Sequence, residues 1–286
     1  MASYRTLIDV AALAACREAV VVDCRFDLED TARGEAAYAE GHIPGAVYAH
    51  LDRDLSNPAL TDRGRHPLPP PARLAEVLGR LGIAAGRQVV AYDAGNGMMA
   101  ARLWWMLRYM GHDEAAVLDG GFQAWVAAGQ PLEAGVRTAE PVAFIGRPRP
   151  ERLALLDEVV EAVATRPSLA FELVDARDPA RYRGEVEPID RRAGHIPGAR
   201  NHCFRKNLDA SGRFLPPALL KEAFVGSLGT LPDATTVHYC GSGVTACHNV
   251  LAQVHAGLPE PRVYCGSWSE WSRDAQRPGA TGDYTP

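Results

Sequence analysis

Long apolar segments are absent from this sequence. No uninterrupted apolar run approaches the roughly 18–20 residues that are needed to cross a bilayer, so we expect no contact with membranes. The apolar stretch at residues 1–23 is interrupted by Asp9, Arg17 and Glu18, and it therefore differs from a secretory signal peptide. It is more typical of a helix that leads into a strand. We therefore expect a cytoplasmic protein.

Paired cysteines and excess positive charge are also missing. The 286 residues include 6 cysteines, which show neither regular spacing nor a CxxC pair. This pattern predicts reduced thiols, with neither a disulfide framework nor a structural metal site. The formal net charge of −5 provides no basic surface for nucleic acid. The composition, 47% hydrophobic and 23% charged, is that of a globular chain, whose length suggests about two domains.

What the sequence does contain is an internal repeat. The motif GHIPGA occurs at 41–46 and again at 194–199. An apolar run, a glycine-rich turn and a helical pattern follow one another at 89–107 and again at 236–254. Each copy then reaches a similar end, LDGGFQAW in one and YCGSWSEW in the other. Because the landmarks recur in the same order with similar spacing, the chain is predicted to be a tandem duplication.

Each copy has the pattern of an α/β domain. Short apolar runs such as AVVVD, QVVAYD, FELVD and TTVHYC alternate with helical segments, for example 71–82 and 152–166. Short unbroken apolar strands between helices predict a mainly parallel sheet that is flanked by helices on both faces. The segment 131–151 contains several prolines and no sustained periodicity, so the join is expected there. We place the two domains at 1–145 and 146–286.

Cys240 stands at the end of an apolar strand, before a glycine-containing turn and a helix. Reactive groups collect at the carboxyl ends of parallel strands. Gly241 and Gly243 allow the backbone N–H groups to converge on the sulfur, which favours the reactive thiolate, although an inert core cysteine is the alternative. The residue six positions on is Ala246, so the arginine of a Cys-x5-Arg phosphatase loop is missing. We therefore predict that Cys240 carries a terminal sulfur as a persulfide.

The whole chain resembles the two-domain rhodanese-type sulfurtransferases. The similar segments are YAEGHIPGA (38–46), RLWWMLRYMGH (102–112), LDGGFQAW (118–125) and VYCGSWSEW (263–271). The loop CGSGVTA that starts at Cys240 is similar to that of the 3-mercaptopyruvate sulfurtransferases, whereas thiosulfate-preferring rhodaneses usually carry basic residues there. The resemblance implies two rhodanese-like domains and an enzyme that moves sulfur from 3-mercaptopyruvate through a Cys240 persulfide to a small thiol, thioredoxin or cyanide. It implies no metal and no organic cofactor.

Two other functions remain open from the sequence. Thiosulfate:cyanide sulfurtransfer is the nearest alternative, and a non-enzymatic redox-sensing or binding module is another. In the first copy, Asp93 stands where the second copy has Cys240. Aspartate cannot hold a persulfide, so domain 1–145 is expected to be catalytically silent and domain 146–286 to be catalytic.

The resemblance also implies roles for individual residues. Ser242 matches a serine that the mercaptopyruvate enzymes are proposed to use with a histidine and an aspartate from the first domain. His66 and Asp52 match those two partners. Asp54 and Asp62 are rivals for the aspartate, because the loop between aspartate and histidine is variable.

Arginine is suited to holding a substrate carboxylate, because its planar fork bonds both oxygens. Arg181 matches the first substrate-binding arginine of the family. The sequence is two residues shorter than the family pattern before the second GHIPGA, so Asp190, Arg191 and Arg192 compete for the second position, and we prefer Arg191. The remaining substrate-binding positions are expected in the loop after the cysteine, at Gly241, Gly243, Val244 and Thr245.

Overall fold

The computed structural model describes residues 3–165 and 171–284, which divide into two compact units. The main boundary between the units falls between Arg149 and Pro150. Each unit also includes one short segment from the other half of the sequence. The first unit contains residues 1–57, 69–149 and 210–214, and the second contains 58–68, 150–209 and 215–286.

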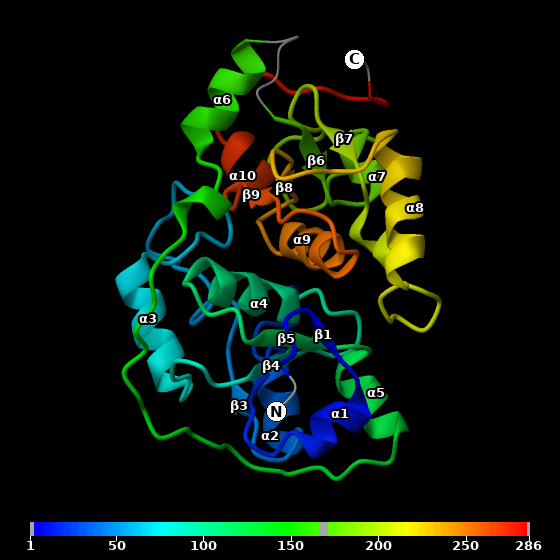
Figure 1. The fold of residues 1–286 in the computed structure, drawn as a ribbon. Coiled ribbons are helices and arrows are strands. Elements are labelled where there is room, and N and C mark those ends of the chain that lie inside the picture. The colour runs from blue at the N-terminus through cyan, green and yellow to red at the C-terminus, as the bar shows by residue number, and fades with distance from the viewer. Residues whose placement is uncertain (1–2, 166–170, 285–286) are drawn as a thin grey trace. The chain divides into compact units, whose positions relative to one another are not determined.

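The first unit is built on a five-stranded parallel sheet with the strand order β1-β5-β4-β2-β3 (Figure 1). Its strands are β1 (Leu7–Ile8), β2 (Val20–Asp23), β3 (Val47–Tyr48), β4 (Val89–Tyr92) and β5 (Ala115–Leu118). Its helices are α1 (Val10–Ala15), α2 (Arg33–Glu40), α3 (Pro71–Arg80), α4 (Ala100–Tyr109) and α5 (Gly121–Ala127).

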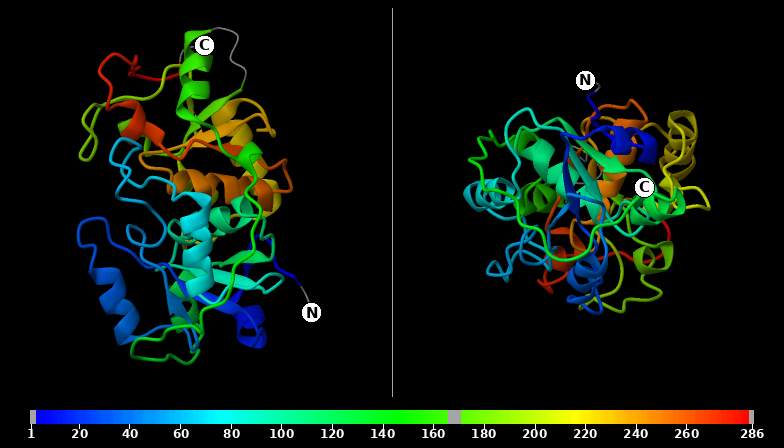
Figure 2. Two further views of the ribbon diagram at one scale, coloured as in Figure 1. Left: turned by 90° about the vertical axis from the view of Figure 1, so that its left-hand side faces the viewer. Right: turned by 90° about the horizontal axis from the view of Figure 1, so that it is seen from below.

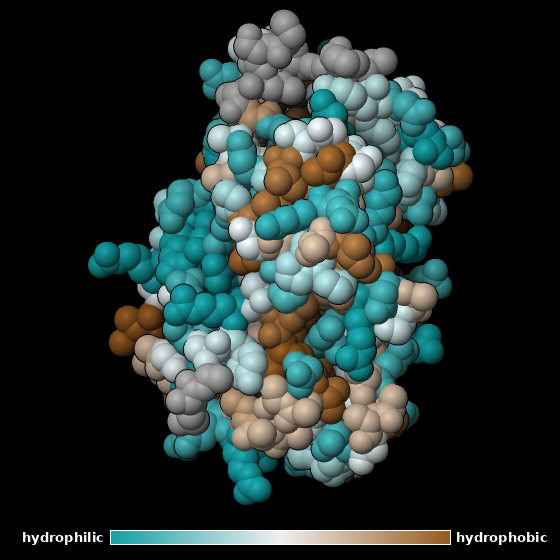
Figure 3. Space-filling view, turned by 45° about the vertical axis from the view of Figure 1, so that its right-hand side comes forward, coloured by the Kyte–Doolittle hydropathy of each residue, from teal (hydrophilic) through white to brown (hydrophobic). Residues whose placement is uncertain are grey.

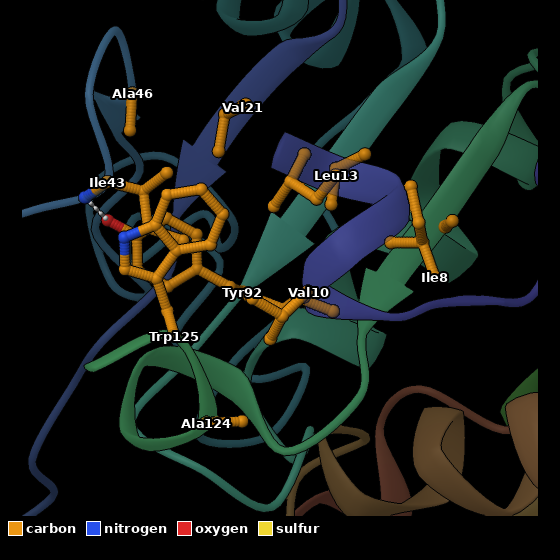
Figure 4. Packing of buried hydrophobic residues seen from close by; sticks show 12 residues of the cluster. Ile8, Val10, Leu13, Val21, Ile43, Ala46, Tyr92, Ala124 and Trp125 are labelled. Atoms are coloured by element: carbon orange, nitrogen blue, oxygen red, sulfur yellow. Dashed lines mark hydrogen bonds between the residues drawn. The ribbon is translucent and has the colours of Figure 1, made fainter. Parts of the chain in front are cut away.

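Both faces of this sheet are buried, which explains why its strands are apolar without interruption. Successive side chains of a strand point to opposite faces. Tyr92 belongs to a cluster with Leu13 of α1 and Trp125 of α5 (Figure 4). Its neighbour Ala91 points the other way and is also buried, on the face where α4 packs against β4 and β5. The sheet therefore lies between two layers of helices.

The second unit repeats this plan with a four-stranded parallel sheet in the order β7-β6-β8-β9. Its strands are β6 (Leu173–Asp175), β7 (Arg200–Asn201), β8 (Val237–Tyr239) and β9 (Arg262–Val263). Its helices are η1 (Pro150–Arg152), α6 (Leu156–Ala164), α7 (Pro179–Tyr182), η2 (Phe204–Asn207), α8 (Pro217–Leu228), α9 (Thr245–His255) and α10 (Ser267–Trp271). The strand β8 lies between β6 and β9 in the sheet. The residue that follows β8 therefore lies among the loops that leave the neighbouring strands.

The predicted duplication is visible in the contacts as well as in the topology. Arg25 bonds the carboxylate of Asp23 at the end of β2, with 2.6 Å between Nη2 and Oδ2. Arg177 bonds Asp175 at the end of β6 with the same 2.6 Å separation. Each of the two arginines also donates to a carbonyl oxygen that lies just before the following GHIPGA histidine. The predicted fold, two α/β domains with parallel sheets flanked by helices, is confirmed.

The segment 131–149 joins the two repeats as an extended trace, which is green in the turned view of Figure 2. It contains the most exposed large apolar side chains of the described residues, Ile145 and Val136. On the face seen in Figure 3, hydrophilic side chains predominate and the apolar ones form smaller patches. None of the helices within residues 3–165 and 171–284 has the length and apolar character of a membrane span.

Candidate active site

The glycine-rich turn after β4 binds a negative charge through its backbone N–H groups. The carboxylate of Asp93 is buried, and Oδ1 accepts hydrogen bonds of 3.0 Å from the backbone N–H groups of Gly95 and Gly97. Oδ2 accepts bonds of 2.8 and 3.2 Å from the N–H groups of Met99 and Ala100. Burial raises the pKa of the carboxyl, and the four N–H groups oppose that shift. In the first unit, therefore, the backbone N–H groups of this turn form an anion-binding site, and the carboxylate of Asp93 occupies it.

The corresponding turn of the second unit holds Cys240. This residue is buried at the carboxyl end of β8, and the Gly243 N–H lies 3.1 Å from its Sγ atom. Gly243 has a φ of 78°, a left-handed conformation that glycine adopts without strain. The helix α9 begins at Thr245, and no side chain caps its first turn. The positive end of the helix therefore faces the turn that holds the sulfur, where it favours a negative charge.

The start of α10 fixes the backbone of the cysteine turn. The Cys240 N–H donates to Ser267 Oγ at 3.1 Å, and the Cys240 carbonyl accepts from the Trp268 N–H at 2.9 Å. The carbonyl of Gly241 accepts from the Ser269 N–H, also at 2.9 Å. Within the part of the chain that is described, Ser267 is the only non-glycine residue with positive φ, at 56°. A strained residue thus holds the backbone of the candidate nucleophile.

The structure brings Ser242 and His66 together. Ser242 Oγ and His66 Nδ1 lie 2.7 Å apart, and both side chains are buried. His66 lies in segment 58–68, which belongs to the same compact unit as Cys240. The segment is fastened at the preceding residue as well, because the Arg65 N–H donates to Ser269 Oγ at 3.0 Å.

Two guanidinium groups converge beside Gly241, the residue after the cysteine. A Cβ atom on Gly241 would lie 3.0 Å from Arg65 Nη2 and 3.7 Å from Nη1 and Nη2 of Arg181. Glycine at this position therefore lets both positive groups approach the loop closely. Arg181 was predicted from the sequence, whereas Arg65 was missed. Its only sequence signal is its place directly before His66, and nothing local links that position to Cys240.

Two carboxylates hold these guanidinium groups. Asp190 Oδ1 accepts from Arg65 at 2.7 Å, and its Oδ2 accepts from Arg181 at 3.1 Å. Glu187 Oε1 accepts from Arg181 Nη2 at 2.6 Å. Burial opposes ionisation of Glu187, but the hydrogen bonds from Arg181 and from the Asp190 N–H hold its pKa below the ordinary value. The arginines are thus fixed in place before any ligand binds.

Arg191 and Arg192, the other candidates for the second arginine position, have different surroundings. Arg191 is exposed, and its side chain forms no hydrogen bond or ion pair with residues 3–165 or 171–284. It lines a cavity of about 370 Å³ together with Arg65 and Asp190. Arg192 donates to the carbonyl of Arg277 at 2.9 Å, and its guanidinium lies over the ring of Trp268.

The candidate aspartates differ in their surroundings. Asp52 lies in the first unit, and its N–H donates to His50 Nδ1 at 3.2 Å, so its predicted role stays a prediction. Asp54 is buried and is held by Arg80. Asp62 belongs to the second unit and is largely exposed.

The other cysteines form no disulfide among the described residues. All six cysteines are free thiols, and Cys247 Sγ donates to the Gly243 carbonyl at 3.2 Å, which supports the turn. No group of three or more histidine, cysteine, aspartate or glutamate side chains is placed to hold a metal ion within the ranges that the structure describes.

Comparison with known proteins identifies the family of the chain. The rhodanese-like domain family matches residues 6–128 and again residues 155–274. The chain belongs to the rhodanese family. Among curated relatives of this rhodanese, a probable 3-mercaptopyruvate sulfurtransferase of Pseudomonas aeruginosa is 51% identical over 267 residues, spanning 92% of this chain and 93% of the relative. A putative thiosulfate sulfurtransferase of Mycobacterium tuberculosis is 38% identical over 92% of this chain and 90% of its own length.

A solved structure with the same fold is the 3-mercaptopyruvate sulfurtransferase from Leishmania major. Its TM-score to this rhodanese is 0.83 at 34% sequence identity, covering 94% of this chain and 74% of the Leishmania chain. Mercaptopyruvate and thiosulfate are therefore both found in the names of relatives of this rhodanese.

Proposed function

We propose that this rhodanese is a 3-mercaptopyruvate sulfurtransferase whose second unit carries the reaction on Cys240. The observation that carries the proposal is the surroundings of the Sγ atom, which accepts a backbone N–H at 3.1 Å while two arginines converge on the next residue. The turn itself has no basic side chain, since Gly241 and Ser242 follow the cysteine. Asp93 fills the equivalent cradle in the first unit, and we propose that this unit is catalytically silent.

The Cys240 thiolate attacks the sulfur of the donor. A sulfur–sulfur bond forms, the carbon–sulfur bond breaks, and the electron pair of that bond leaves on the enolate of pyruvate. The backbone N–H groups of residues 241–245 then stabilise the negative charge of the terminal persulfide sulfur without adding a titrating partner. In a second half-reaction the persulfide passes this sulfur to an acceptor, so the cycle is ping-pong.

The departing enolate needs a proton to become pyruvate. We assign this proton to the Ser242 hydroxyl, since His66 Nδ1 lies 2.7 Å from Ser242 Oγ and can replace the proton that the hydroxyl gives up. Asp52 is the predicted group that orients the imidazole, with Asp54 and Asp62 as the alternatives that the sequence leaves open.

The donor carboxylate is assigned to the arginines. Arg181 and Arg65 present nitrogen donors beside Gly241, in the planar geometry that suits a carboxylate. Gly243, Val244 and Thr245 contribute backbone groups to the same site. Arg191, which we preferred from the sequence, lies at the rim of the adjoining cavity and can attract an anion from there.

We propose a small thiol, thioredoxin or cyanide as the sulfur acceptor, and a cytoplasmic location for the protein. Mass spectrometry of the alkylated small thiol and thioredoxin would detect a persulfide on either, and an assay for thiocyanate would detect transfer to cyanide. These proposals rest on the resemblance to the rhodanese family and on the sequence.

The proposed donor choice is tested by steady-state kinetics with the two donors. A donor whose carboxylate lies several ångströms from its sulfur can reach both the arginines and Cys240, so kcat/KM should favour 3-mercaptopyruvate over thiosulfate by at least about tenfold. Replacing Arg181 with alanine should reduce the mercaptopyruvate reaction more than the thiosulfate reaction. A wild-type preference for thiosulfate would reject the mercaptopyruvate assignment in favour of thiosulfate:cyanide sulfurtransfer.

A further inference from the structure

The charges around Gly241 balance one another before any ligand binds. Arg65 and Arg181 bring two positive charges, and Asp190 and Glu187 bring two negative ones. Asp190 is the carboxylate shared by both arginines, with one oxygen on each, and its side chain is only 4% exposed. These four side chains therefore have a defined geometry and no net charge among themselves, while Arg191 and Arg273 line the adjoining cavity.

Hydrogen-bond donors are nevertheless left over on both arginines. Arg65 Nε is buried without a hydrogen-bond partner among the described residues. Arg65 Nη2 and Arg181 Nη1, the atoms near Gly241, form no hydrogen bond within the described ranges either. These N–H groups can donate hydrogen bonds to the two oxygens of one carboxylate. A ligand with a second negative charge would meet the Asp190 carboxylate at close range.

We propose that Asp190 determines donor specificity by its charge, so that the site accepts singly charged donors in preference to dianions. The inference rests on the proposed function, because 3-mercaptopyruvate carries one carboxylate whereas thiosulfate is a dianion. Asp190 lowers the positive electrostatic potential at the arginine N–H groups beside Gly241, and it does so without occupying the position of the ligand. Repulsion from a fixed negative charge grows in proportion to the charge of the ligand, so the dianion is penalised about twice as much as the monoanion.

The change Asp190→Asn removes the charge and preserves the shape of the side chain. Binding of both donors should improve, and binding of thiosulfate should improve more. The ratio of kcat/KM for mercaptopyruvate to that for thiosulfate is expected to fall about tenfold, with most of the change in KM. Glu185→Gln is the matched control, because Glu185 lies in the same loop but is exposed and pairs with Arg183. The control should leave the ratio within about twofold of wild type.

Alkylation of Cys240 tests the same idea without any sulfur donor. Iodoacetate carries one carboxylate and iodoacetamide carries none, and the thiolate displaces iodide from each. The iodoacetate-to-iodoacetamide rate ratio at Cys240, read by peptide mass spectrometry, should rise several-fold in Asp190→Asn and stay unchanged in Glu185→Gln. Asp190→Ser provides a second neutral variant if the asparagine variant does not fold.

The two possible failures are distinguishable. An unchanged alkylation ratio in a folded Asp190→Asn protein overturns the inference, whatever the wild type uses as donor. A wild type that prefers thiosulfate overturns the proposed function instead, and the alkylation ratio then still decides the role of Asp190.

Discussion

Ser267, which binds the backbone of the cysteine turn, has a strained left-handed backbone conformation. Its φ of 56° equals that of Gly121, which occupies the corresponding position after β5 in the first unit. Gly121 adopts this conformation at no steric cost, whereas a serine is strained there. The Ser267 hydroxyl accepts the Cys240 N–H and donates to the Tyr264 carbonyl at 2.9 Å. We infer that serine is used in the second unit because its hydroxyl fixes the nucleophile.

Two substitutions separate the strain of Ser267 from the role of its hydroxyl. Ser267→Ala keeps the strain and leaves the buried Cys240 N–H without its acceptor, so unfolding should become easier by about 1–3 kcal/mol. Ser267→Gly loses the same hydrogen bond but relieves the strain, and should recover about 1 kcal/mol of that loss.

Urea unfolding measures the stability of the two variants, and alkylation of Cys240 by iodoacetamide reports the reactivity of the sulfur. Both variants should react more slowly than wild type, by a similar factor, since both lack the hydroxyl. A glycine variant as reactive as wild type would show that the hydroxyl does not position Cys240.

For single residues, the sequence could indicate a place in the candidate site only where the residue belongs to a recognisable motif. Cys240 and Ser242 could be placed because a strand, a turn and a helix follow one another locally, and His66 because its surroundings resemble a family segment. Arg65 and Asp190 could not be placed beside Gly241 in this way. Their positions depend on the docking of segment 58–68 against the second unit, which is a contact between residues far apart in the chain.

Buried polar side chains join β8, α9 and η2 into one block. His238 of β8 lies 2.9 Å from Gln253 of α9, between Nε2 and Oε1. His202 Nε2 lies 2.8 Å from Asn207 Oδ1 in η2, and Asn207 donates to Asn249 Oδ1 of α9 at 2.8 Å. Burial lowers the pKa of His238 to about 4 and that of His202 to about 3. Both rings are therefore neutral in the folded protein at neutral pH.

This block should make the protein sensitive to mild acid. The unfolded chain protonates these histidines near pH 6.5, whereas the folded chain does so only near pH 3–4. Because the folded pKa is lowered, the stabilisation is complete above about pH 6.5 and is lost as the pH falls toward 4. Each histidine should reduce the free energy of unfolding by about 1.4 kcal/mol per pH unit in that window.

Urea unfolding at several pH values between about 7 and 4.5 measures this slope. His238→Gln should flatten it by about one proton, because glutamine cannot be protonated there. His255→Gln, at the partly exposed end of α9, is the matched control and should change the slope less. An equal slope in wild type and His238→Gln would contradict the assignment of His238 as a buried neutral ring.

The elements themselves were well predicted wherever local patterns define them. The apolar runs before Asp93 and Cys240 form β4 and β8, and the helical pattern predicted after the cysteine forms α9, which ends at His255. The periodicity could not show that the sheets differ in strand number, because β1 consists of only two residues, too few for a pattern.

For the whole molecule, the duplication could be predicted because its sequence landmarks recur in the same order. The exchanged segments 58–68 and 210–214 could not, since they carry no repeat of their own and contact the unit encoded by the other half of the chain. The first of these segments supplies His66 and Arg65 to the candidate site. The unit that we propose to be catalytic therefore differs from the second half of the sequence.

We propose that one sulfur travels on Cys240 and that the first unit carries none. The most direct test is the mass of the intact protein after incubation with 3-mercaptopyruvate alone, followed by peptide mapping. We predict a gain of one sulfur atom, about 32 mass units, on the peptide that contains Cys240, and no gain in Cys240→Ser. Cys240 would not be the carrier if the sulfur atom were found on Cys24 of the first unit, on Cys247 or on Cys265. Sulfur uptake by the Cys240→Ser protein would lead to the same conclusion.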